Sequence, residues 1–175
     1  EIDENTARYL VECCGSGMQE LINELRKVIE YAGLGGTITK ESIDKLCIKQ
    51  MQAIIFDLTD YLGAKNVGKA LEILKKLEYN KQPVQKILIT LYNHFKKLYI
   101  VKISNEYKTN LAESMNLKPN QMFLTRKYSE QARFFTKEEL RKIIDELINL
   151  DAGYKQGLID LDIGLDSILC RYCSK

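Results

Sequence analysis

Apolar side chains recur at intervals of three and four residues along nearly the whole chain, the spacing that lines one face of an α-helix. The longest such face follows Pro83 and consists of Val84, Ile87, Leu88, Leu91, Phe95, Leu98 and Tyr99. The 175 residues include only two prolines, which break helices, and no segment has a convincing strand pattern. Leu, Ile, Lys and Glu, which favour helix, dominate the composition. The sequence therefore predicts an all-α fold.

Breaking and capping residues divide the N-terminal part of this pattern into short helices. Residues 15–17 interrupt the first, and Ser16 with Gln19 is predicted to cap the second in a capping box. Gly33 is placed to end that second helix, and Thr39 is a favourable N-cap for a third. Three helices of this length enclose only a small core, so we expect this segment to pack against another part of the protein.

Similar signals set helix boundaries in the remainder of the chain. Pro83 is predicted to occupy the first position of the long helix, and Pro119 to open another helix. Thr136 and Glu139 form a predicted capping box for a helix that reaches about Lys155. We place the boundary between the two regions near Ile48, which gives predicted domains of residues 1–47 and 48–175.

Charge and hydropathy set limits on location and partners. The 26 basic and 24 acidic side chains leave a formal charge of +2, which gives no large net attraction for nucleic-acid phosphates. No apolar run approaches the roughly 20 residues that cross a bilayer, and the N-terminus lacks the pattern of a signal peptide. We therefore expect a cytoplasmic protein without membrane contact. Because the sequence starts at Glu1 and leads directly into a helical pattern, we also expect a piece of a longer protein.

The five cysteines are an odd number in a chain without a secretion signal, which predicts reduced thiols and no disulfide. Cys170 and Cys173 have the spacing of half a zinc site. Their flanks read as helix, no second pair of this spacing exists, and the lone histidine, His94, is remote in sequence. We therefore predict ordinary thiols and no metal site.

No motif for catalysis or cofactor binding stands out. Residues 33–37 are rich in glycine but lack the lysine and the preceding strand of a phosphate-binding loop, so a helix terminus is the favoured interpretation. His94 lies among core positions of its helix, and the acidic residues form no carboxylate pair or calcium loop. The sequence predicts no catalytic, cofactor-binding or metal residue and no cofactor, so we do not expect an enzyme.

One basic and aromatic cluster leaves a nucleic-acid alternative open. Its members are Arg126, Lys127, Tyr128, Arg133, Phe134 and Phe135. Such mixtures can contact phosphates and stack on bases, although solvated helix faces often have the same composition. A stand-alone helical nucleic-acid-binding module is therefore the alternative function, with no individual binding residue assigned.

Several segments, in this order, resemble the delta subunit of the bacterial DNA polymerase III clamp loader. Residues 17–27, GMQELINELRK, are similar to the family's glycine followed by an Asn-Glu-Leu-x-Lys helix. Ile38 and Thr39 come before a short helix, and residues 55–60, IFDLTD, resemble the helix that opens the family's last domain. The family's closing signature is similar to residues 132–136, ARFFT, followed by Leu140, Leu147, Asp151, Lys155 and Gly157.

The resemblance implies that residues 1–47 end a helical lid domain and that residues 48–175 form the multi-helix collar domain. In this family the collar joins delta to delta-prime and to gamma or tau copies in a ring that encloses primer-template DNA. Neighbouring gamma or tau subunits bind and hydrolyse ATP, and an N-terminal domain, which the resemblance implies is missing here, grips the sliding clamp. The implied role is non-catalytic support of clamp loading during replication, within the DNA polymerase III holoenzyme.

An assembly module needs apolar side chains outside its own core. The aromatic candidates for contact with neighbouring subunits are Phe56, Tyr92, Tyr99 and Tyr172. For each of them, packing inside its own domain is the competing interpretation and the one that we favour.

Overall fold

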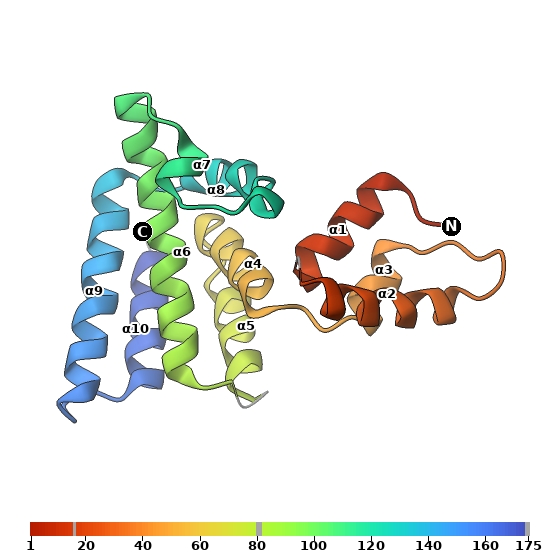
Figure 1. The fold of residues 1–175 in the computed structure, drawn as a ribbon. Coiled ribbons are helices and arrows are strands. Elements are labelled where there is room, and N and C mark those ends of the chain that lie inside the picture. The colour runs from red at the N-terminus through yellow and green to blue at the C-terminus, as the bar shows by residue number, and fades with distance from the viewer. Residues whose placement is uncertain (16, 80–81, 174–175) are drawn as a thin grey trace. The chain divides into compact units, whose positions relative to one another are not determined.

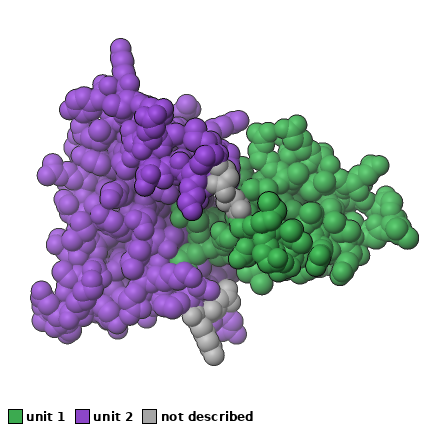
Figure 2. Space-filling model, viewed as in Figure 1, with its two compact units in different colours: residues 1–54 green, residues 55–175 purple. Residues whose placement is uncertain are grey.

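The computed structural model describes residues 1–15, 17–79 and 82–173, with Asn120 and Cys173 described by their backbone alone. Within these ranges every regular element is a helix, which confirms the predicted all-α class (Figure 1). The chain divides into two compact units, residues 1–54 and residues 55–175, which Figure 2 colours separately. None of the described helices is long and apolar enough to cross a membrane.

The first unit contains three mutually contacting helices, α1 (Glu4–Cys14), α2 (Met18–Ala32) and α3 (Lys40–Leu46), and ends within the first turn of a fourth. Its core contains the buried side chains of Leu10, Cys13, Cys14, Val28, Ile38 and Ile43. From α2 only Val28 is buried, while Met18 and Ile29 are exposed. So small a unit encloses few side chains, and most of the predicted apolar face of α2 is left partly or fully in solvent.

Capping residues explain where these helices begin and end. Asp3 accepts hydrogen bonds from two backbone N–H groups in the first turn of α1. Thr39 caps α3 as predicted, since its hydroxyl accepts from the Ser42 N–H while the Ser42 hydroxyl accepts from the Thr39 N–H. Gly33 ends α2 with a φ of 70°, a left-handed conformation that glycine adopts without strain. Residues 33–37 are thus a helix terminus and a loop.

The central helix of the second unit is α6, with bounds Val84–Tyr107. It contacts the four helices that follow it, namely α7 (Leu111–Ser114), α8 (Leu124–Ala132), α9 (Lys137–Lys155) and α10 (Leu161–Cys173). The last helix, α10, also contacts α9 and α5 (Val67–Tyr79). Ahead of these, α4 (Met51–Gly63) crosses the boundary between the two units and buries Ile55, Leu58 and Leu62. The second unit is therefore built around one long helix with a buried apolar face.

The predicted signals for α9 are present. The Thr136 hydroxyl accepts from the Glu139 N–H, and the Glu139 carboxylate accepts from the Thr136 N–H, which completes the capping box. The helix ends at Lys155, whose ammonium lies 2.6 Å from the Asp151 carboxylate one turn earlier. The start and end of α9 thus follow the capping residues and the charge pair that its sequence contains.

Three other predicted helix boundaries involve Pro83, Pro119 and Ser16. Pro83 is the N-cap of α6 and not its first residue, because its ψ of 126° is extended. Pro119 opens only a short 3-10 turn, Pro119–Gln121, and the α-helix that follows starts at Leu124. Ser16 lies outside the described residues, and α2 follows Gly17 without a side-chain cap.

Candidate subunit-docking surface

A mostly apolar groove of about 160 Å³ lies between α6 and α9 of the second unit. Its lining residues are Leu88, Ile89, Tyr92, Leu147, Ile148 and Asp151. Leu88 and Leu147 are buried, whereas Ile89 is 57% exposed and Ile148 is 48% exposed. The two isoleucines therefore keep apolar surface in water that a bound partner would remove.

Consecutive apolar residues explain why isoleucine side chains lie on this surface. Successive residues of an α-helix point about 100° apart, so three neighbours cannot all face one core. Ile87 and Leu88 are buried, and Ile89 consequently faces outward. On α9, Leu147 is buried and the next residue, Ile148, is half exposed for the same reason.

A second groove, of about 360 Å³, lies between α9 and α10. Its apolar lining includes Leu150, Ile159, Ile163 and Ile168, and Ile163 is 71% exposed. Gly164 lets α10 approach α9 closely, because a β-carbon there would lie 2.2 Å from Cδ1 of Leu150. The two grooves flank α9, and we call them together the α9 surface, defined by Leu88, Ile89, Tyr92, Leu147, Ile148, Leu150, Ile159 and Ile163.

The four aromatic interface candidates have different surroundings. Phe56 is buried, with its ring centroid 4.8 Å from that of Tyr128. Tyr172 is buried too, and its hydroxyl donates to Oε1 of Glu146 at 3.0 Å. Tyr99 is half-buried, and Tyr92 is half-buried in the lining of the first groove. Tyr92 is thus the candidate that lies on the α9 surface, where aliphatic side chains provide most of the exposed apolar area.

The basic and aromatic cluster keeps little aromatic surface for stacking on bases. Tyr128 and Phe135 are buried, and Phe134 is half exposed. The ammonium of Lys127 lies 5.3 Å from the centroid of the Phe56 ring, and the guanidinium of Arg126 pairs with Glu130 at 2.8 Å. The nucleic-acid alternative therefore depends mainly on basic side chains that also have partners within the chain.

His94 belongs to a buried polar network that connects α6, α8 and α4. Its Nε2 lies 2.8 Å from Oε1 of Gln131, while Nε2 of Gln131 donates to the Phe56 carbonyl at 2.8 Å and to Oδ1 of Asp60 at 2.6 Å. Because the Gln131 amide nitrogen is the donor to two oxygens, its oxygen accepts from the His94 N–H. Burial, with a smaller contribution from nearby Lys97, lowers the pKa of His94 to about 3 against the opposing effect of the hydrogen bond with Gln131. His94 is neutral at physiological pH and is enclosed in the core.

We expect Gln131→Met to destabilise the second unit by about 1 to 3 kcal/mol, because the substitution removes the acceptor of the buried His94 Nε2–H and one of the donors to the Phe56 carbonyl. Methionine has nearly the volume of glutamine, so the loss reports on hydrogen bonding more than on a cavity. Urea unfolding followed by circular dichroism measures the change.

Gln85→Met is the matched control. Gln85 is exposed and donates to the Tyr154 hydroxyl at 2.7 Å, so its loss is expected to cost less than about 1 kcal/mol because water replaces the partner. Equal costs for the two variants would contradict a structural role for the buried network.

Two groups of cysteines bear on metal binding. Cys170 is half-buried on α10, and the side chain of Cys173 lies outside the described residues. Among the residues that the structure describes, one group brings three potential ligands together, namely Cys14, Glu24 and Cys47 of the first unit. Sequence spacing gave no indication of this group, because its members come from three different helical segments.

The comparison with protein families decides how the helical second unit is classified. The family model described as DNA polymerase III delta subunit, C-terminal domain, matches residues 52–172. The chain belongs to the DNA polymerase III delta subunit family. The resemblance seen in the ordered sequence segments is thereby confirmed.

Two curated delta-subunit relatives match most of the chain. The probable DNA polymerase III subunit delta of Aquifex aeolicus is 28% identical over 159 residues, which cover 88% of this chain and 45% of the relative. The DNA polymerase III subunit delta of Bacillus subtilis is 26% identical over 174 residues, covering 97% of this chain and 49% of the relative. The chain thus spans about half the length of these delta subunits.

A solved delta-subunit structure has the same fold. The Bacillus subtilis DNA clamp loader delta protein superimposes with a TM-score of 0.84 and 24% sequence identity. The match covers 99% of this chain and 51% of that protein. The helical arrangement of both units therefore has a counterpart in a clamp-loader protein.

Proposed function

We propose that this chain is the lid and collar part of a clamp-loader delta subunit and supports loading of the sliding clamp on primed DNA during replication. In this proposal residues 1–47 are the end of the lid domain and residues 48–175 are the collar domain. The observation that carries the proposal is the family match over residues 52–172, which falls almost entirely in the second compact unit.

The α9 surface is the proposed contact with neighbouring clamp-loader subunits, gamma or tau and delta-prime. Its exposed isoleucines, Ile89 and Ile148 in one groove and Ile163 in the other, provide apolar surface of the kind found at the centre of stable interfaces. Charged side chains at its edges, Asp151 in one groove and Arg171 in the other, provide polar contacts around this centre. Burial of the three isoleucines would contribute most of the binding energy.

The proposed role contains no chemical step in this part of the protein. ATP would be bound and hydrolysed by neighbouring gamma or tau subunits, and the sliding clamp would be contacted by an N-terminal domain of the full delta subunit. Primer-template DNA would meet this chain only in the assembled complex. The setting for all of these steps is the cytoplasm, where replication takes place in bacteria.

The test is co-elution of this chain with gamma or tau and delta-prime of the same organism in size-exclusion chromatography, with affinities from titration calorimetry. We expect Ile148→Glu to weaken assembly at least about tenfold, because a carboxylate would be desolvated against an apolar partner surface. Circular dichroism should show an unchanged helical fold, since Ile148 is half exposed.

Met122→Glu is the matched control, because Met122 is also 48% exposed but lies outside both grooves. It should bind the partner subunits like the unmodified chain. Equal weakening by both variants would rule out the α9 surface as the contact, and failure of the unmodified chain to associate with any of these subunits would overturn the collar proposal.

A further inference from the structure

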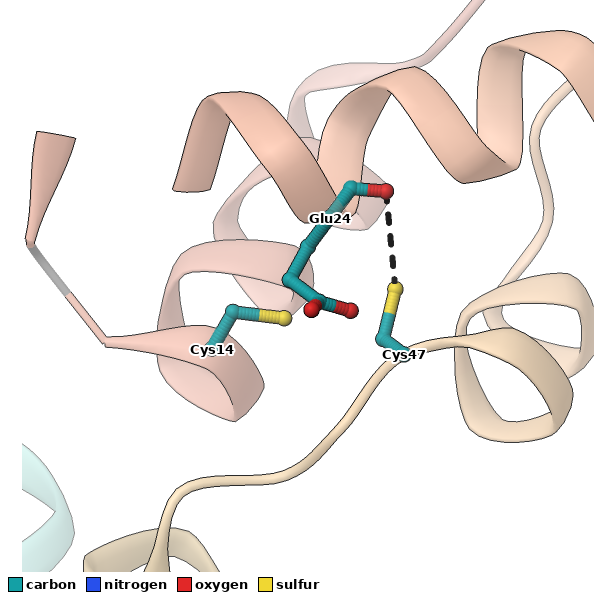
Figure 3. Close-up of side chains that lie close together, drawn as sticks. All are labelled: Cys14, Glu24 and Cys47. Carbon is teal, nitrogen blue, oxygen red and sulfur yellow. Dashed lines mark hydrogen bonds between the residues drawn. The ribbon is translucent and has the colours of Figure 1, made fainter. Parts of the chain in front are cut away.

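Cys14, Glu24 and Cys47 converge in the first unit, far from the α9 surface in sequence and independent of the proposed assembly. Cys14 is the last residue of α1, Glu24 lies in the middle of α2, and Cys47 is the C-cap of α3. The two sulfur atoms and a carboxylate oxygen all lie within 4.8 Å of one another. Figure 3 shows the Cys14 thiol beside the Glu24 carboxylate, and the Cys47 thiol donating to the backbone carbonyl of Glu24 at 3.9 Å.

This separation is close to what a tetrahedral zinc site requires. Zinc–sulfur bonds of about 2.3 Å and zinc–oxygen bonds of about 2.1 Å place neighbouring ligand atoms roughly 3.5 to 4 Å apart. A movement of less than about 1 Å per side chain therefore brings the three atoms to bonding positions around one ion. Two thiolates with one carboxylate suit zinc, whereas magnesium and calcium prefer oxygen ligands alone.

The surrounding contacts hold these ligands in place. Oε2 of Glu24 accepts from Nζ of Lys27 at 2.6 Å and from the Ile48 N–H at 3.0 Å, and these two bonds orient the carboxylate. The Cys47 N–H donates to the Ile43 carbonyl at 2.9 Å, and the Gln50 N–H donates to the carbonyl of Cys13 at 2.9 Å. These bonds fix the segment that carries Cys47 against the end of α1.

We propose that Cys14, Glu24 and Cys47 bind one Zn²⁺ ion, with a water molecule as the fourth ligand. The ion would connect all three helices of a unit whose own core is small, and would stabilise that unit because the unfolded chain does not hold the ligands together. Binding displaces the two thiol protons, which leave to solvent as the zinc–sulfur bonds form. Burial raises the pKa of both Cys14 and Cys47, so the thiols carry those protons when no metal is bound.

Cobalt titration of the full chain under reducing conditions tests the site, because Co²⁺ occupies zinc sites and absorbs in the near ultraviolet when thiolates bind it. We expect one equivalent of Co²⁺ to produce this absorption, one equivalent of Zn²⁺ to abolish it, and Zn²⁺ to raise the thermal midpoint of unfolding. Cys14→Ser and Cys47→Ser should each lose most of the absorption, and Glu24→Gln should weaken binding by about 10- to 100-fold.

Cys170→Ser is the control, since Cys170 lies in the second unit, and it should leave the titration unchanged. Absence of thiolate absorption in the unmodified chain at excess Co²⁺ overturns the proposal without reference to any variant that fails to fold. Absorption that persists in Cys47→Ser but disappears in Cys170→Ser also overturns it, because the ion would then bind near the end of α10.

Discussion

Acidification from about pH 6.5 toward pH 3 is expected to remove about 4 to 5 kcal/mol of stability from the second unit through His94 alone. An unfolded histidine takes up a proton near pH 6.5, whereas burial lowers the pKa of folded His94 to about 3. Between these values the unfolded chain binds the extra proton, so stability falls with falling pH by about 1.4 kcal/mol per unit. Above pH 6.5 the stability should be independent of this group.

His94→Gln separates this effect from the titration of carboxylates. Glutamine can still donate to Oε1 of Gln131 but does not titrate, so the variant should lose less stability over the same pH range. Urea unfolding at a series of pH values gives the two slopes. Parallel slopes for the variant and the unmodified chain would show that His94 is protonated in the folded state, contrary to its complete burial.

Leu91→Ala is expected to cost about 3 to 5 kcal/mol of unfolding free energy, because Leu91 is fully buried on the central helix α6. The cost combines lost burial of the removed carbons with the cavity that remains among neighbouring helices. Circular dichroism during urea unfolding measures the change, and the midpoint should move without a change in slope.

Ile89→Ala is the internal control on the same helix, two residues away. Ile89 is mostly exposed, so its truncation should cost less than about 1 kcal/mol. The same substitution should weaken binding to the partner subunits, whereas its effect on folding stays small. A large stability loss in Ile89→Ala would mean that this side chain is part of the core and not of a docking surface.

Local rules predicted most helices of this fold from sequence. The boundaries at Gly33, Thr39, Thr136 and Lys155 follow from capping and from left-handed glycine, which depend on a few neighbouring residues. Positions that depend on tertiary contacts were harder to predict. The helix expected to open at Pro119 begins only at Leu124, after a 3-10 turn.

The candidate sites were less accessible to sequence reasoning for a physical reason. Helical periodicity identifies an apolar face but not what covers it, so Phe56 and Tyr172 were interface candidates although both are buried. Three consecutive apolar residues in a helix, such as residues 87–89, do indicate an exposed apolar side chain, because the three cannot all face one core. This signal was missed in the sequence. The group of Cys14, Glu24 and Cys47 had no signal of this kind, since its members meet only after three helices pack.

The side-chain amide of Gln131 restricts how α8 can pack against α4 and α6. Apolar side chains tolerate several packings of similar energy, whereas this amide satisfies His94, Phe56 and Asp60 in a single geometry. Rotation of α8 by one residue would break these three hydrogen bonds, and the loss of the acceptor of the buried His94 N–H would cost about 1 to 3 kcal/mol. The network thereby favours one rotation of α8 about its axis over other rotations that hydrophobic contacts alone would not distinguish.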